Sequence, residues 1–117
     1  MRVAFSILNG RIAPVFDSSK YLIILDLKND SIAKCMEYAF LNDNLYQIVR
    51  TTMVLKINTL VCGAISKRLR IILNTMGIKT IPFISGDIKT IIQGFIDHEL
   101  NHPDFLMPGC KNNNDEI

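Results

Sequence analysis

The sequence has few cysteines, and no two of them lie close together in the sequence. Its three cysteines, Cys35, Cys62 and Cys110, form no Cys-x-x-Cys spacing, which argues against a disulfide framework and against a zinc or thioredoxin motif. This cysteine content favours a reducing, cytoplasmic setting. Long apolar runs are also missing, so we expect no membrane span, and the first residues, MRVAFSIL, lack the pattern of a signal peptide.

An excess of charge of one sign is equally absent. Lysine and arginine number 13 and aspartate and glutamate 11, which leaves a formal net charge of +2 at pH 7. A balance this small indicates neither a nucleic acid nor an acidic membrane as partner. Apolar residues, in contrast, make up 49% of the 117 residues, enough for the core of one domain. We expect this domain to cover residues 1–106 and the polar residues 107–117 to form a flexible tail.

Signatures of catalysis are missing as well. The sequence contains no Ser–His–Asp pattern, no phosphate-binding glycine loop and no dinucleotide fingerprint. Its first apolar stretch, RVAFSIL, carries no carboxylate, whereas a two-metal nuclease needs several converging acidic residues. We therefore expect a protein that is not an enzyme.

Alternating and apolar segments predict three adjacent strands at the start of the chain. Arg2–Leu8 alternates and is rich in strand-forming residues, and it ends at the strong turn signal Asn9-Gly10. Arg11–Lys20 is too long for a tight hairpin and predicts a loop. Tyr21–Leu27 is nearly all apolar, which predicts a strand covered on both faces. Ile32–Phe40 alternates and predicts a half-exposed strand.

The pattern then changes to helical spacing interrupted by short strands. Leu69, Ile72 and Leu73 fall on one helix face, and Gly77 follows as a C-terminal stop. The expected elements are a helix that begins at Asn42, Asp43 or Asn44 and runs to Met53, a strand that ends at Leu60–Val61, a helix from Ser66 to Met76, a strand over Ile78–Phe83, and a helix that begins at Ser85–Asp87, presents Ile88, Ile91, Ile92 and Phe95, and ends before Pro103.

This order of elements predicts an α/β fold. Strands joined by short links pair antiparallel, and strands separated by helices run parallel with right-handed crossovers. We therefore expect a mixed five-stranded sheet flanked by helices.

The stretch from Thr59 to Met76 is the strongest candidate for a binding site. Ser66 is a suitable N-cap, and a helix N-terminus with Lys67 and Arg68 beside it favours anions. Cys62 adds a sulfur at the strand end, where a thiolate would be stabilised. This combination suits an anionic or metal–sulfur ligand. The ordinary alternative is a solvated basic turn and a small, buried, apolar Cys62.

The other candidate metal ligands leave two interpretations each. Cys110 follows Pro-Gly in the tail, where it is either a flap over a bound cluster or a bystander. Cys35 lies in the middle of a strand and favours packing. His98 and His102 share a face if the last helix continues that far, but the neighbouring Pro103 favours a frayed helix end.

Several segments together resemble the dinitrogenase iron–molybdenum cofactor biosynthesis domain. The resemblance covers Met1 to Phe95 and is carried by RVAF, GRIAPVF, YLIILDL and VCGAISKRLRIILNTMGIKT, and MPGC at Met107–Cys110 resembles a tail of some members. It implies a ribonuclease H-like fold and the binding or carriage of an iron–molybdenum–sulfur cofactor or precursor, with a protein partner in cofactor assembly. One departure is Val15, because the family often has histidine after this proline.

The predicted site lies between the Asn9–Phe16 loop and the Cys62–Arg68 turn. Gly10 and Gly63 permit close backbone approach, and the cations offset anionic charge. The predicted cofactor-binding residues are Gly10, Arg11, Phe16, Cys62, Gly63, Ser66, Lys67 and Arg68, and the predicted metal ligands are Cys62 and Cys110. A second function remains open, namely an interaction or regulatory module that keeps the fold without the cofactor. Val15 favours this second function, and the cysteines and the basic turn favour the first.

Overall fold

A computed structural model describes residues 1–40 and 44–109 of the chain. The elements are β1 (Arg2–Leu8), β2 (Arg11–Ile12), β3 (Tyr21–Lys28), β4 (Ser31–Ala39), α1 (Leu45–Val54), β5 (Thr59–Val61), α2 (Lys67–Thr75), β6 (Lys79–Ile81), α3 (Ile88–Ile96) and the short 3-10 helix η1 (Pro103–Phe105). Within these residues no helix is both long and apolar enough to cross a membrane.

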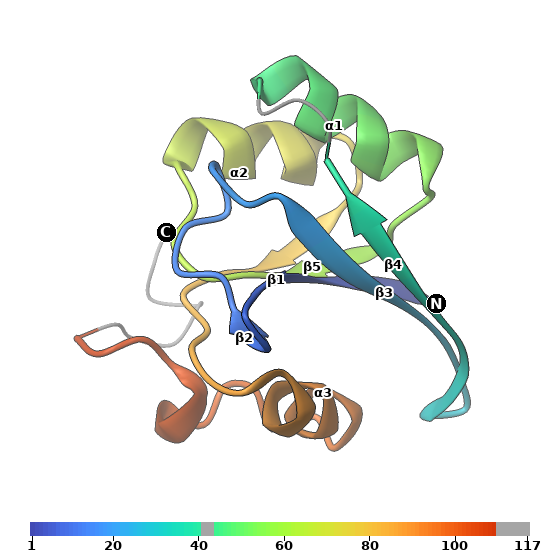
Figure 1. The fold of residues 1–117 in the computed structure, drawn as a ribbon, viewed down its shortest axis with the longest axis vertical. Coiled ribbons are helices and arrows are strands. Elements are labelled where there is room, and N and C mark those ends of the chain that lie inside the picture. The colour runs from blue at the N-terminus through green and yellow to red at the C-terminus, as the bar shows by residue number, and fades with distance from the viewer. Residues whose placement is uncertain (41–43, 110–117) are drawn as a thin grey trace.

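The strands form one mixed sheet in the order β4-β3-β1-β5-β6. β1, β3 and β4 pair antiparallel, and β1, β5 and β6 pair parallel. Helices cover both faces of this sheet, with α1 and α2 on one face and α3 on the other (Figure 1). The predicted α/β fold with a mixed sheet flanked by helices is therefore confirmed.

The segment that was predicted as a loop begins with a sixth strand. Asn9 and Gly10 have φ angles of 52° and 76°, and positive values at both central residues are typical of a two-residue hairpin turn. The turn brings Leu8 opposite Arg11. The prediction of five strands was wrong here because only the first two residues of Arg11–Lys20 pair with β1, too few to produce an alternating pattern.

The two faces of the sheet carry separate clusters of buried side chains. The α1–α2 face includes Leu22 and Ile24 from β3, and the α3 face includes Leu25. β3 is thus buried on both faces, as its apolar sequence predicted. Phe5 of β1 stacks edge to face on Phe95 of α3, with ring centroids 5.8 Å apart, which fixes α3 against the sheet.

The helix boundaries follow the predicted caps. The side chains of Asn44, Ser66 and Asp87 each accept a hydrogen bond from a backbone amide of the first turn, which satisfies donors that the helix itself leaves unpaired. Gly77 has a φ of 88° just beyond α2. α2 ends at Thr75, one residue before the predicted end at Met76, and Met76 is the C-cap and is 46% exposed.

β4 is more exposed than its alternating pattern predicted. Met36 and Tyr38 pack partly against the α1–α2 face, but Cys35 is exposed. The prediction that Cys35 packs in the core was wrong because β4 is the outermost strand of the sheet. Sequence alternation identified a strand but not its place at the edge.

Candidate functional site

The candidate site lies at the carboxyl ends of the parallel strands. β1, β5 and β6 run in the same direction, so the loops that follow them leave the sheet at one edge. In open α/β sheets this edge is where ligands bind. The loops are Asn9–Lys20 after β1, residues 62–66 after β5 and residues 82–87 after β6.

Backbone hydrogen bonds join the first two loops. The amide of Phe16 donates to the carbonyl oxygen of Ala64 at 2.7 Å, and the amide of Ala64 donates to that of Pro14 at 2.8 Å. These bonds form a parallel bridge between Val15 and Ala64. The structure therefore brings the Asn9–Phe16 loop and the Cys62–Arg68 turn together.

Gly63 makes this close contact possible. A Cβ atom at this position would lie 2.4 Å from the carbonyl oxygen of Ala13 and 2.6 Å from that of Pro14. Both atoms belong to the backbone, so neither could move aside as a flexible side chain would. The predicted role of Gly63 in close backbone approach is thus explained, although the approaching segment is the protein's own loop.

Asp17, a carboxylate outside the predicted set of site residues, contacts the start of α2. The Oδ1 atom of Asp17 accepts a hydrogen bond of 2.8 Å from the amide of Ser66, and the Oγ atom of Ser66 accepts one of 3.3 Å from the amide of Leu69. Within the described residues the amides of Lys67 and Arg68, the first two of α2, have no acceptor. The helix N-terminus therefore keeps two free donors beside an internal negative charge.

The third loop completes the packing at this edge. The amide of Phe83 donates to Gly63 at 2.9 Å, and the amide of Ile84 donates to Cys62 at 3.0 Å. The carbonyl oxygen of Gly10 accepts a hydrogen bond of 3.0 Å from the amide of Ile88. Gly10 thus forms the turn that the sequence predicted, and it also bonds to the start of α3, which the sequence analysis did not predict.

The predicted site residues divide into a buried group and an exposed group. Phe16 and Cys62 are 0% exposed and belong to the core of the α1–α2 face. Arg11, Lys67 and Arg68 are exposed. A ligand that approaches from solvent therefore meets the cations and not the aromatic ring or the sulfur.

The thiol of Cys62 is in the opposite protonation state to the one considered from the sequence. Burial raises the pKa of Cys62 far above its ordinary value, the nearby Asp17 carboxylate raises this pKa further, and Arg70 opposes the shift. The expectation of a stabilised thiolate was wrong, and the alternative of a small buried side chain is confirmed.

The other candidate metal ligands do not assemble. Among residues 1–40 and 44–109, no group of three or more His, Cys, Asp or Glu side chains is placed to hold a metal ion. His98 lies 3.4 Å from Asp30 and His102 lies 3.5 Å from Asp104, beyond the end of α3. Cys110 lies outside the described residues, so its predicted role as a flap or metal ligand stays a prediction.

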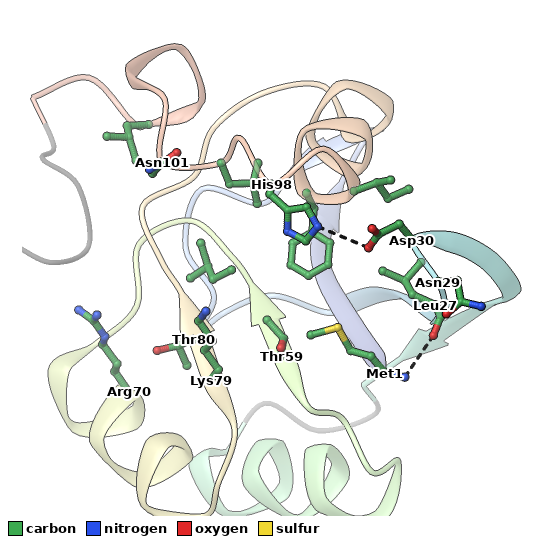
Figure 2. A pocket seen from close by; sticks show the side chains of 15 residues that line it. Met1, Leu27, Asn29, Asp30, Thr59, Arg70, Lys79, Thr80, His98 and Asn101 are labelled. Carbon is green, nitrogen blue, oxygen red and sulfur yellow. Dashed lines mark hydrogen bonds and ion pairs between the residues drawn. The ribbon is translucent and has the colours of Figure 1, made fainter.

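A cavity of about 780 Å³ lies away from the predicted site. Figure 2 shows Thr59 and Lys79 at the amino ends of their strands, with Met1, Asp30 and His98 on the opposite wall. Apolar side chains of α3 and of the following segment line its floor. None of the predicted cofactor-binding residues lines this cavity, which extends along β6 from Lys79 to Ile81.

The fold is that of a small α/β protein with one mixed sheet. The chain belongs to the dinitrogenase iron–molybdenum cofactor family, whose model matches residues 1–98. No curated protein matches it. The family resemblance inferred from the sequence is thereby confirmed.

Solved structures of low sequence identity share the fold. The crystal structure of PH0822 superposes with a TM-score of 0.80 at 18% identity, covering 85% of this chain and 91% of the other. MJ0327 from Methanocaldococcus jannaschii gives 0.66 at 20% identity, with 85% and 90% covered. The apo form of the orange protein from Desulfovibrio gigas gives 0.70 at 16% identity and covers 95% of each chain.

Proposed function

We propose that this chain is a non-enzymatic protein that binds or carries an iron–molybdenum–sulfur cofactor, its precursor, or a related metal–sulfur cluster. The main support is the set of exposed cations, Arg11, Lys67 and Arg68, on the two segments that pack together at Gly63. Cations beside a helix N-terminus attract anions. Membership of the family supports the choice of an anionic metal–sulfur cluster as cargo.

The binding mode that fits these residues is electrostatic. Cys62 is buried and protonated, and Cys35 lies on the outermost strand, so neither sulfur is available to a ligand at the loop edge. The two free amides at the start of α2 and the side chains of Lys67 and Arg68 supply positive charge instead. Cys110 remains the one predicted sulfur ligand whose position is open.

Titration with tetrathiomolybdate under anaerobic conditions, followed by optical spectra, tests this proposal. The double variant Lys67→Ala/Arg68→Ala should bind at least about tenfold more weakly, and its binding should depend less on salt. The matched control is Lys28→Ala/Lys79→Ala, which removes the same charge from two exposed residues at the other end of the strands. Equal weakening in both variants would place the site elsewhere.

The second candidate function is an interaction or regulatory module without a cofactor. The inaccessible sulfur of Cys62 and the presence of Val15 in place of a frequent histidine favour it. Absence of saturable binding of thiomolybdate and of isolated iron–molybdenum cofactor by the unmodified full chain would reject the carrier and leave this module.

A further inference from the structure

The cavity beside α3 has an outer wall that is fixed by hydrogen bonds. After Leu100 the chain returns from α3 to the loop that follows β6. There the amide of Met107 donates to the carbonyl oxygen of Phe83 at 2.7 Å, and the amide of Ser85 donates to that of Phe105 at 2.8 Å. The cavity measures about 780 Å³, a volume that is typical of pre-formed sites for small molecules.

The strand alternation places Thr59 and Lys79 on the wall of this cavity. Leu60 packs in the cluster on the α1–α2 face and Val61 in the cluster on the α3 face. Thr59, two residues before Val61, therefore lies on the α3 face. Lys79 pairs with Thr59 in the parallel register, and both side chains line the cavity (Figure 2). A hydroxyl and an ammonium group thus lie on neighbouring strands on the same side of the sheet.

The hydroxyl of Thr59 is buried without a partner. Among the described residues the buried polar ones are Ser6, Ser19, Thr52, Thr59 and Thr80. The other four hydroxyls each take part in a hydrogen bond. Thr59 is 1% exposed, and its hydroxyl forms no hydrogen bond within residues 1–40 and 44–109. An unsatisfied buried hydroxyl is costly, so a ligand that supplies its partner is favoured.

The charge around Thr59 is positive. Lys79 is exposed and forms no ion pair within the described part of the chain, and Arg70 of α2 also lines the cavity. The carboxylate of the opposite wall belongs to Asp30, which lies 3.4 Å from His98 and has a side chain that is 68% exposed. Solvent screens this negative charge, so the cavity favours an anion next to Thr59.

The remaining lining of the cavity is mainly apolar. Ile81 follows Lys79 by two positions on β6, lies on the same face and packs against the α3 cluster. Phe95, Leu100 and Leu106 line the cavity from α3 and the returning segment. A hydrated anion without an apolar part would lose water here and gain few polar partners. The lining therefore suits a ligand with an anionic end and an apolar body.

We propose that this cavity is a binding site for a small organic carboxylate with an apolar body, such as a medium-chain fatty acid or an arylalkanoate. Its two carboxylate oxygens accept hydrogen bonds from the hydroxyl of Thr59 and the ammonium group of Lys79. Its apolar body lies along Ile81 against Phe95 and Leu100. This site is additional to the loop edge and uses none of the residues proposed there.

Titration of the isotope-labelled full chain with octanoate, followed by the amide chemical shifts in two-dimensional NMR spectra, tests the proposal. We expect saturable shifts at Thr59, Lys79 and Ile81, with a dissociation constant below about 1 mM. Octanol lacks the charge and acetate lacks the apolar body, so each should bind at least about tenfold more weakly. No saturation up to about 10 mM octanoate, equal affinity for octanol, or shifts that centre on Lys67 and Arg68 would each overturn the proposal.

Lys79→Met tests the ammonium group because it keeps a long side chain without the charge. This variant should bind octanoate about tenfold more weakly. The matched control is Lys89→Met, which removes an exposed lysine of α3 that does not line the cavity, and its affinity should stay unchanged. Unchanged affinity in Lys79→Met, or equal weakening in both variants, would contradict the site.

Thr59→Val tests the hydroxyl because valine has nearly the same shape. Octanoate should bind about fivefold more weakly, and the melting temperature should not fall, since the hydroxyl has no partner among the described residues. The matched control is Thr52→Val, which loses the hydrogen bond to the carbonyl oxygen of Val49 and should lose stability while it keeps its affinity for octanoate. A Thr59→Val protein that binds octanoate as tightly as the unmodified chain would overturn the proposed contact and with it the site.

Discussion

The loops at the carboxyl ends of the strands and the outer strand β4 differ in how their backbone amides and carbonyls are hydrogen-bonded. Around Gly63, the amides and carbonyls of three loops bond to one another. Along β4, one side of the backbone bonds to β3 and the other side faces solvent. Each region also contains a cysteine: Cys62 is buried and Cys35 is exposed.

This difference separates the two ways in which the protein could bind something. The loop region is already packed, so a ligand there must bind to its exposed cations and free amides without entering between the loops. Among the described residues no second strand pairs with β4, and free backbone groups along a strand suit an extended chain better than a small anion. A cysteine's identity alone indicates neither role, since Cys62 and Cys35 differ only in their surroundings.

The largest expected effect is that of Gly63→Ala. Its Cβ would overlap two backbone oxygens of the opposing loop, so we expect the free energy of unfolding to fall by about 3 kcal/mol or more. Urea denaturation measures this loss.

The matched control is Gly10→Ala. Gly10 has a positive φ of 76°, a conformation that favours glycine, but no atom lies within 4 Å of an added Cβ. Only conformational strain should result, about 1 kcal/mol. Equal losses for Gly63→Ala and Gly10→Ala would mean that the loops separate easily and that the region is not closed.

The next effect compares the two cysteines directly. Cys62→Ser places a hydroxyl in an apolar core, which should cost about 2 kcal/mol. Cys35→Ser changes an exposed side chain and should cost less than about 0.5 kcal/mol. Thermal and urea unfolding of both variants give these values, and a stable Cys62→Ser protein would contradict the burial of this residue.

Cys62 should also make the protein sensitive to alkali. Its pKa is raised by burial in the folded state, so above about pH 8.5 the unfolded thiol loses its proton while the folded thiol keeps it. Stability must then fall as pH rises, with a slope that approaches about 1.4 kcal/mol per pH unit. Cys62→Ser should remove this contribution and Cys35→Ser should not. If the unmodified protein, Cys62→Ser and Cys35→Ser all lose stability with the same slope above about pH 8.5, the raised pKa of Cys62 is contradicted.

The sequence predicted those parts of the fold that depend on neighbouring residues. Apolar spacing located the strands and helices, and the caps Asn44, Ser66 and Asp87 fixed where the helices begin. Each of these signals acts within a few residues, so a single sequence contains it fully. The sequence analysis also placed a binding site between the Asn9–Phe16 loop and the Cys62–Arg68 turn, and the structure brings these two segments together.

The parts that could not be predicted depend on distant segments. Cys35 was assigned to the core because alternation indicates a strand without its position in the sheet. Cys62 was considered as a thiolate because its sequence neighbours suggest a helix N-terminus, whereas its burial comes from packing against other elements. The hydrogen bond between Asp17 and Ser66 spans 49 positions, and no local signal indicates it.

A smaller effect, on the affinity for a metal–sulfur cluster, is expected from placing a histidine in the loop that carries Val15. Val15 is 45% exposed at the loop that meets Ala64, and the family often has histidine at this position. Val15→His should therefore tighten binding of a metal–sulfur cluster by about tenfold if the loop edge is the site. The control is Met53→His on α1, where the side chain is 48% exposed. Tighter binding in both variants would indicate unspecific metal capture by histidine.

The smallest effect should come from removing residues 109–117. This deletion tests where the packed loops at the carboxyl ends of the strands end along the chain. Met107 donates its amide to the carbonyl oxygen of Phe83 at 2.7 Å, and this bond is retained when the chain stops at Pro108. The removed residues, GCKNNNDEI, contain little apolar surface to bury. The melting temperature should therefore change by no more than about 2 °C.

A second deletion from Leu106 onward also removes the bond to Phe83 and the bridge between Ile84 and Leu106, so it should lower the melting temperature clearly. If the two deletions destabilise the protein equally, residues 109–117 contribute to the packed edge, and the predicted boundary between domain and tail is wrong.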